Sequence, residues 1–110
     1  MINMETKFAK QRIIKDIKNT DERIQVTGYI KKFEENLITL DDESGQIQVN
    51  ITNVDFKFKV NDLVNIIGNI ELKSDGKYIL QADIIQDMNN LNFKYYQQLY
   101  QLKKELESSE

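Results

Sequence analysis

Hydrophobic side chains recur at every second residue through the middle of the chain, which is the pattern of strands with one buried face. The alternation runs from Arg23 to Lys32, from Leu37 to Asp41 and from Gln46 to Ile51. Two further strands are predicted from Leu63 to Leu72 and from Lys77 to Ile85. The residues expected to point inward are Ile24, Val26, Gly28, Ile30, Ile38, Leu40, Ile47, Val49, Ile51, Val64, Ile66, Ile70 and Leu72.

Residues typical of turns separate these strands. Asp42 to Gly45 divides the second strand from the third, and Asp75-Gly76 predicts a type I′ hairpin, in which both central residues take positive φ. The segment from Thr52 to Asp62 fits either an irregular connection or one more short strand. Gly28 and Gly68 stand inside the first and fourth strands, where a closing barrel needs a bend or a close backbone approach. Strands joined mostly by hairpins favour a small closed barrel over a flat sheet with open edges.

The pattern therefore predicts a mainly β protein, a five-stranded OB-fold barrel over residues 23–90. Residues 1–22 form a polar leader whose apolar positions fit a helical face as well as an extended strand. Beyond Asn90 the apolar positions recur at steps of three and four, which predicts a C-terminal α-helix of about 14 to 16 residues within 91–110. Asn92 is the expected N-cap of this helix.

The predicted helix carries more apolar surface than a helix lying on a small barrel must bury. Either the stripe caps the open end of its own barrel, as surface helices usually bury one face, or its remaining face docks a partner. We expect a subunit interface made of Phe93, Tyr96, Leu99, Tyr100, Leu102 and Leu106.

Composition narrows the class of protein. The 110 residues are 40% hydrophobic and 30% charged, as expected of one soluble globular domain. No apolar run is long enough to span a bilayer, and the first residues lack the apolar core of a secretory signal. We therefore expect an intracellular protein with no membrane contact.

The residue types that usually carry catalysis are scarce. The chain has no Cys and no His, which excludes disulfides, thiolate nucleophiles, the usual structural zinc sites and the commonest general base. Asp41, Asp42 and Glu43 form a carboxylate run, but adjacent strand residues point to opposite faces and no third ligand follows at a fitting spacing, so a turn is predicted. We expect no enzyme, and hence no catalytic residue, metal, cofactor or small-molecule substrate.

Charge is distributed unevenly along the chain. The formal net charge is −3, and residues 36–91 carry 4 basic and 9 acidic side chains, whereas residues 1–35 carry 8 and 6. A free-standing nucleic-acid binder usually shows the opposite balance, because Lys and Arg contacts to phosphate dominate affinity. Any such role must therefore rest on a local patch or on partner subunits.

Several short motifs, taken in order, point to a known family. They are VTGYI at 26–30, Leu40-Asp41-Asp42 followed by a turn and a hydrophobic strand, Gly68 in the fourth strand, and IQDMN at 85–89 before the helix. Over about residues 23 to 106 the chain resembles the middle subunit of replication protein A, and it is similar to the related middle subunits of telomere-capping complexes.

The resemblance implies an OB domain that joins larger and smaller OB-fold subunits through a helical bundle. It also implies that this domain contributes part of a surface that binds single-stranded DNA. It implies a nuclear location in a eukaryote, or cytoplasm and nucleoid in a prokaryote. The family stacks aromatic side chains on bases at the end of the third strand and in the hairpin between strands four and five. This chain has Thr52 and Lys73 at the matching places.

Candidate strand-binding residues follow from how OB-folds bind nucleic acid. Such folds use the outer faces of strands two and three and the loops between strands one and two and between four and five. Cations there follow the backbone and flat side chains stack on bases. For the lysines a solvated surface is the alternative, and for Phe33 and Tyr78 the alternative is packing at the barrel rim. The candidates are Tyr29, Lys31, Lys32, Phe33, Lys73, Lys77 and Tyr78.

We therefore expect a subunit of a single-stranded DNA-binding complex for replication or repair, assembled through its C-terminal helix, with a weak strand-binding surface of its own. The alternatives are a telomere-capping subunit, an OB-fold protein-interaction adaptor or an RNA-binding module, since one barrel hosts many ligands.

Overall fold

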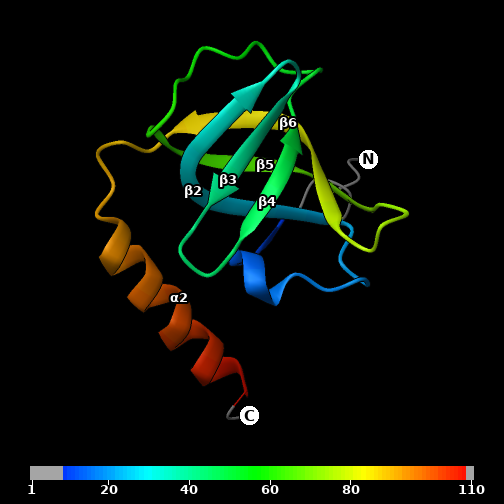
Figure 1. The fold of residues 1–110 in the computed structure, drawn as a ribbon. Helices are drawn as coiled ribbons and strands as arrows, with labels where there is room; N and C mark the ends of the chain where they lie inside the picture. The colour runs from blue at the N-terminus through cyan, green and yellow to red at the C-terminus, as the bar shows by residue number, and fades with distance from the viewer. Residues whose placement is uncertain (1–8, 109–110) are drawn as a thin grey trace, which may run out of the picture.

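Five strands roll up into a closed barrel (Figure 1). The computed structural model describes residues 9–108. The barrel order is β2-β3-β4-β6-β5, and β5 pairs again with β2, so no barrel edge stays open. Within the barrel, all pairings are antiparallel except that of β4 with β6. The barrel strands are β2 (Arg23–Glu34), β3 (Leu37–Asp41), β4 (Gln46–Asn50), β5 (Leu63–Leu72) and β6 (Tyr78–Asp87).

This architecture confirms the predicted five-stranded OB-fold barrel. β3 and β5 begin and end where the alternation predicts, and the others differ by one or two residues at one or both ends. β2 runs on to Glu34 because it keeps pairing with β3 as far as Leu37, beyond a register shift between Ile30 and Lys32. The segment 52–62, left open by the sequence, contains no strand.

The N-terminal segment, whose conformation the sequence left open, is irregular with two short elements. β1 (Lys10–Gln11) adds a parallel strand beside β2, and η1 (Ile14–Asp16) is one turn of 3-10 helix. The rest of the predicted leader, residues 1–8, lies outside the described residues. Ile14 and Ile17 pack against the barrel core, so the segment belongs to the folded domain.

The alternating side chains fill the barrel, as expected of strands with one buried face. The prediction that Leu72 points inward is wrong. Its side chain is exposed, because Leu72 is the last residue of β5 and lies beyond the end of the packed interior. Ile70 is only partly buried for the same reason. The core consists of Ile24, Val26, Ile30, Ile38, Leu40, Ile47, Val49, Ile51, Val64, Ile66, Leu80 and Ala82.

Gly68 confirms the expected close approach of two backbones. A Cβ at this position would lie 2.0 Å from the carbonyl oxygen of Gln81 on β6. The pairing of β5 with β6 also shifts register between Ile67 and Gly68. The barrel therefore bends at a residue that has no side chain to accommodate.

The hairpin between β5 and β6 is real, but its predicted turn type is wrong. Only Gly76 takes a positive φ, at 85°, and Asp75 does not. The amide of Gly76 donates to the carbonyl of Lys73 at 3.0 Å, and the amide of Lys73 donates to the carbonyl of Lys77 at 2.7 Å. The loop is one residue longer than a two-residue hairpin, and a three-residue loop of this kind ends in a left-handed residue.

Helix α2 (Phe93–Ser108) leaves the barrel after β6 and runs below one end of it, beside the N-terminal segment (Figure 1). The side chain of Asn92 accepts a hydrogen bond from the amide of Tyr95 at 3.0 Å, which confirms the predicted N-cap. Among the described residues, no helix is both long and apolar enough to cross a membrane.

Candidate functional site

The outer face of β3 and β4 is hollowed into a groove of about 640 Å³. Thr39, Gln46 and Gln48 form its floor, because alternate residues of a strand point outward when their neighbours fill the core. The hairpin between β5 and β6 forms one wall, and η1 borders the other side. We call this the strand groove; its remaining lining residues are Ile14, Ile17, Ile47, Lys73, Asp75, Lys77 and Tyr78.

Hydrogen bonds hold the hairpin wall in place. Lys73 Nζ donates to Gln48 Oε1 at 3.1 Å and lies 3.9 Å from a carboxylate oxygen of Asp75. The amide of Lys77 donates to Asp75, and this bond, with the nearby lysines, holds the pKa of the Asp75 carboxyl below its usual value. The groove therefore offers amide and hydroxyl groups, two ammonium groups and one carboxylate. Such a surface can hold a sugar-phosphate backbone, with Tyr78 as its one ring.

Three of the seven predicted strand-binding residues, Lys73, Lys77 and Tyr78, thus meet in this groove. Tyr29 and Lys31 lie elsewhere. Tyr29 packs edge-to-face on Phe93 of α2, with ring centroids 5.3 Å apart, and the ammonium group of Lys31 lies 5.7 Å from the Tyr29 ring centroid. Tyr29 therefore supports the helix, and part of its ring is covered by Phe93.

Lys32 and Phe33 lie at a third place, the far end of β2. Lys32 pairs with Glu34 at 3.4 Å on the exposed surface. Phe33 is half exposed and packs on Phe56, with centroids 5.1 Å apart, and Phe56 in turn contacts Phe58 at 5.8 Å. Both loop phenylalanines are partly buried against the core. The predicted binding set is thus split among three surfaces, and a role for each residue in binding DNA stays a prediction.

Two residues of the predicted subunit interface are used inside the chain. Phe93 and Tyr100 are buried, with 7% and 8% of their surfaces exposed. Tyr96 stacks on Phe93 with centroids 6.0 Å apart, and its hydroxyl accepts a hydrogen bond from Gln11 at 2.8 Å. This face of the helix packs on its own domain, so Phe93 and Tyr100 are removed from the surface offered to a partner.

The opposite face of α2 is apolar and exposed. Its four residues follow one another at steps of four, three and four, the spacing of a seam between two helices. They have between 43% and 61% of their surfaces exposed. The predicted interface did not include Tyr95, although Tyr95 lies four residues before Leu99 and so fits the same heptad spacing. We call this face the helix stripe: Tyr95, Leu99, Leu102 and Leu106.

The carboxylate run before β4 is a turn, as predicted, and it also anchors the N-terminal segment. The buried side chain of Asp42 accepts hydrogen bonds from the amide of Ile14 at 2.7 Å and from the hydroxyl of Ser44 at 2.6 Å. Gln97 of α2 donates to the carbonyl of Asp42 at 3.1 Å. Within residues 9–108 there is no group of three or more carboxylates that would hold a metal ion.

Comparison with known proteins gives a family match over most of the chain. The family of telomere-capping, CST complex subunits (Ten1) matches residues 9–110. No curated protein sequence matches the chain.

Solved structures share the fold. The crystal structure of the telomere-capping protein Ten1 from S. pombe superposes with a TM-score of 0.74 at 20% identity, covering 89% of this chain and 99% of that one. The chain in the S. pombe Stn1-Ten1 complex gives the same TM-score and identity, covering 89% and 93%. A chain of the replication protein A heterotrimer bound to single-stranded DNA reaches 0.65 at 13% identity, covering 78% and 73%.

These matches refine the resemblance inferred from the motifs. The relation to telomere-capping complexes is confirmed, whereas membership among the middle subunits of replication protein A is not. Since the family match spans the barrel, the N-terminal segment and the helix, the chain belongs to the Ten1 family of telomere-capping, CST complex subunits.

Proposed function

We propose that this chain joins a telomere-capping complex as a non-enzymatic subunit, docks a helix of a larger OB-fold subunit along its helix stripe, and adds a weak contact to single-stranded DNA. In a eukaryotic host the complex would act in the nucleus. The larger subunit would be the counterpart of Stn1, with which the S. pombe protein forms the complex of known structure.

The observation that carries this proposal is the division of α2 into two faces. Phe93 and Tyr100 attach the helix to its own domain, while Tyr95, Leu99 and Leu102 remain exposed along the opposite side. Scattered surface leucines need no explanation, but a continuous apolar row at heptad spacing matches the seam of a helix pair. One helix of a partner covers such a row by inserting side chains between its residues.

The strand groove supports the second part of the proposal. It lies on the outer faces of β3 and β4 and against the β5–β6 hairpin, where OB-folds bind oligonucleotides. With Tyr78 half-buried and Lys73 already bonded to Gln48, the groove has little to hold a strand alone. The partner subunits would then supply most of the affinity.

Assembly can be tested by coexpressing the chain with the host's counterpart of Stn1 and measuring the mass of the product by light scattering. Wild type is expected to form a stable heterodimer. The double variant Leu99→Gln/Leu102→Gln should dissociate at least 100-fold more readily, because two apolar seam residues are replaced by amides that must be desolvated on binding.

The matched control is Lys94→Ala/Gln101→Ala, which changes two exposed residues of the same helix off the seam. Its heterodimer should be as stable as that of the wild type. A heterodimer that survives the Leu99→Gln/Leu102→Gln change, with both proteins folded by circular dichroism, would show that assembly uses another surface.

A second candidate is a protein-interaction adaptor without nucleic-acid affinity, favoured by the acidic balance of residues 36–91 and by the single ring in the groove. A fluorescence titration of the assembled complex with labelled single-stranded DNA and RNA across salt concentrations separates the two. Affinity for DNA that falls steeply with salt supports strand binding. If the Lys73→Gln/Lys77→Gln change leaves the affinity of the assembled complex for DNA and RNA unchanged, the adaptor is supported.

A further inference from the structure

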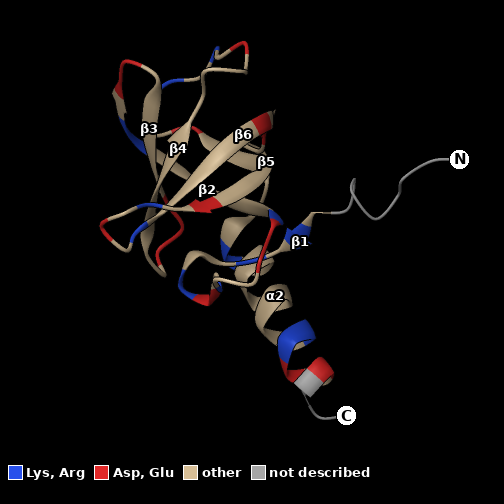
Figure 2. Ribbon diagram, turned by 90° about the vertical axis from the view of Figure 1, so that its right-hand side faces the viewer, with Lys and Arg blue, Asp and Glu red and all other residues tan. Residues whose placement is uncertain are grey.

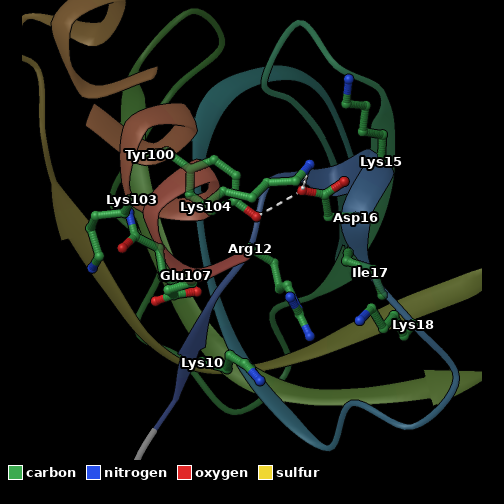
Figure 3. Close-up of a pocket in the computed structure, with 11 residues that line it drawn as sticks. Lys10, Arg12, Lys15, Asp16, Ile17, Lys18, Tyr100, Lys103, Lys104 and Glu107 are labelled. Atoms are coloured by element: carbon green, nitrogen blue, oxygen red, sulfur yellow. Dashed lines mark hydrogen bonds and ion pairs between the residues drawn. The ribbon is translucent and has the colours of Figure 1, made fainter. Parts of the chain in front are cut away.

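A second hollow of about 640 Å³ lies between the N-terminal segment and α2, away from the strand groove's floor (Figure 3). β1 and η1 form one side of it and the last turns of the helix form the other. In Figure 2 the blue segments of α2 and of β1 lie below the barrel on the same side. We call this the basic pocket; its charged lining residues are Lys10, Arg12, Lys15, Asp16, Lys18, Lys103, Lys104 and Glu107.

The pocket is cationic in a protein that is acidic overall. Among the described residues, six basic side chains and two carboxylates line it, whereas the formal charge of the whole chain is −3. Its positive residues come from both ends of the sequence, so only the fold brings them together. A concave surface of one charge sign concentrates counter-ions of the other sign.

Of the carboxylates at the pocket, Asp16 and Asp21 are held by specific basic partners, whereas Glu107 also lines the pocket and offsets one of its cations. Asp21, just behind it, accepts two hydrogen bonds from the guanidinium of Arg12, at 2.9 and 3.0 Å, and both side chains are largely buried. Asp16 accepts from Lys104 Nζ at 2.9 Å and from the hydroxyl of Tyr100 at 2.9 Å. These pairs fix the walls of the pocket and leave its positive charges in excess, four lysines against Glu107.

Four ammonium groups remain for a ligand. Within residues 9–108, the side chains of Lys10, Lys15, Lys18 and Lys103 form no ion pair. All four are exposed to solvent. An anion that enters the pocket would therefore meet exposed ammonium groups that break no ion pair on binding it, although Lys15 and Lys10 also attract Asp16 and Asp21.

The basic pocket continues the strand groove. Ile17 lines both hollows, and η1 forms the ridge between them, with Ile14 on the groove side and Lys15 on the pocket side. A strand that leaves the groove across this ridge would therefore pass onto the lysines of the basic pocket.

We propose that the basic pocket binds the phosphates of single-stranded DNA that leaves the strand groove, and so extends the track around the barrel onto α2. The inference rests on the proposed strand-binding function and assigns the main phosphate contacts to residues outside the OB groove. The buried rings of this region, Tyr100 among them, are not available for stacking, so the contact is to the backbone and independent of base sequence.

A nucleic-acid strand fits the pocket better than an acidic protein segment because the pocket borders the strand groove across η1, so that one strand can contact both hollows. An acidic segment of a partner protein would contact the basic pocket without using the strand groove. The groove's own two lysines, one of them bonded to Gln48, leave a strand short of cations unless it reaches the pocket.

The test is an NMR titration of the full chain with single-stranded oligothymidine, together with fluorescence titrations over a range of salt. Backbone amides of Lys15, Lys18 and Lys103 should shift together with those of the groove. The variant Lys15→Gln/Lys103→Gln should bind roughly 25-fold more weakly at about 0.1 M salt, and the slope of log K against log salt should fall by about 1.4, since each phosphate contact to a single strand contributes about 0.7.

The matched control is Lys57→Gln/Lys94→Gln, which removes the same charge from exposed lysines that line neither hollow. Its affinity should change less than twofold. Suppose that amide shifts are confined to Gln48 and Tyr78 and that the Lys15→Gln/Lys103→Gln variant keeps normal affinity. This result would refute phosphate binding at the basic pocket while leaving the proposed strand binding in the groove intact.

Two other outcomes would also overturn the inference. If polyglutamate occupies the pocket amides more tightly than oligothymidine does, the pocket serves an acidic protein. If oligothymidine shifts no amide at all, strand binding itself fails, and the helix assembly test decides what remains of the proposed function.

Discussion

The hydroxyl of Tyr100 donates a hydrogen bond to Oδ2 of Asp16 at 2.9 Å, across 84 residues of sequence. The same carboxylate oxygen accepts from Lys104 Nζ at 2.9 Å, one turn further along α2. Asp16 ends η1, so this carboxylate fixes the helix to the N-terminal segment and not to the barrel wall. Together with the contacts of Phe93 on Tyr29 and of Gln97 on Asp42, this contact sets the direction of α2 and of the helix stripe.

Replacing Tyr100 by Phe should lower the free energy of unfolding by about 1 to 2 kcal/mol, because a hydrogen bond to a charged group is lost while the ring remains. The pKa of the Asp16 carboxyl lies below its usual value: burial raises it, but the bonds from Lys104 and Tyr100 outweigh burial. In the variant this pKa should rise. Urea denaturation and carboxyl titration by NMR measure the two effects, with Tyr95→Phe on the exposed face as the unchanged control.

Stability should fall on acidification through Asp21. Burial raises the pKa of this carboxyl, but hydrogen bonds from Arg12 and from the amide of Lys18 outweigh it, so the folded-state pKa lies below the unfolded value. Its contribution is therefore present above the unfolded pKa of about 3.9 and is lost as pH falls through the folded pKa.

Asp21→Asn should accordingly be less stable than wild type at pH 7, and should lose less of its remaining stability below about pH 4. Thermal unfolding followed at several pH values measures this. Asp55→Asn, at a largely exposed carboxylate, is the control and should follow the wild-type curve. Parallel pH profiles for Asp21→Asn and wild type would contradict the assignment.

Truncation of Phe93 should lower the free energy of unfolding far more than truncation of Leu102, although both residues belong to the same amphipathic helix. Phe93→Ala should cost about 3 kcal/mol of stability, because its buried ring contacts Tyr29 and Tyr96. Leu102→Ala, on the helix stripe, should change the stability of the isolated chain by less than about 0.5 kcal/mol. Equal losses measured by chemical denaturation would mean that the stripe is covered within the chain.

Gly68→Ala should destabilise the barrel by about 3 kcal/mol or prevent folding. The new Cβ would meet the backbone oxygen of Gln81, which cannot move without separating β5 from β6. Gly76→Asn is the matched control: its φ of 85° is one that Asn tolerates, and no atom lies within 4 Å of a Cβ there. A Gly68→Ala protein with wild-type denaturation would show that the barrel has another way to bend.

Local patterns carried most of the fold prediction and part of the site prediction. The strand from Leu63 to Leu72 could be predicted because the alternation of apolar and polar residues depends only on which side of a strand faces the core. Lys73, Lys77 and Tyr78 were found together because one hairpin carries them. The contact of Tyr29 with Phe93 could not be predicted in this way, because Phe93 lies 64 positions later in the sequence.

The sequence by itself determined the strands, the closure of the barrel, the start of α2 at its Asn92 cap and the absence of thiol or imidazole chemistry, because each follows from residue type and short-range spacing. Only the tertiary structure decided which face of α2 packs inward and which stays exposed. It alone brought Arg12 and Lys15 beside Lys103 to form the basic pocket. The physical reason is that both outcomes depend on contacts between chain segments some 90 residues apart, which no local periodicity records.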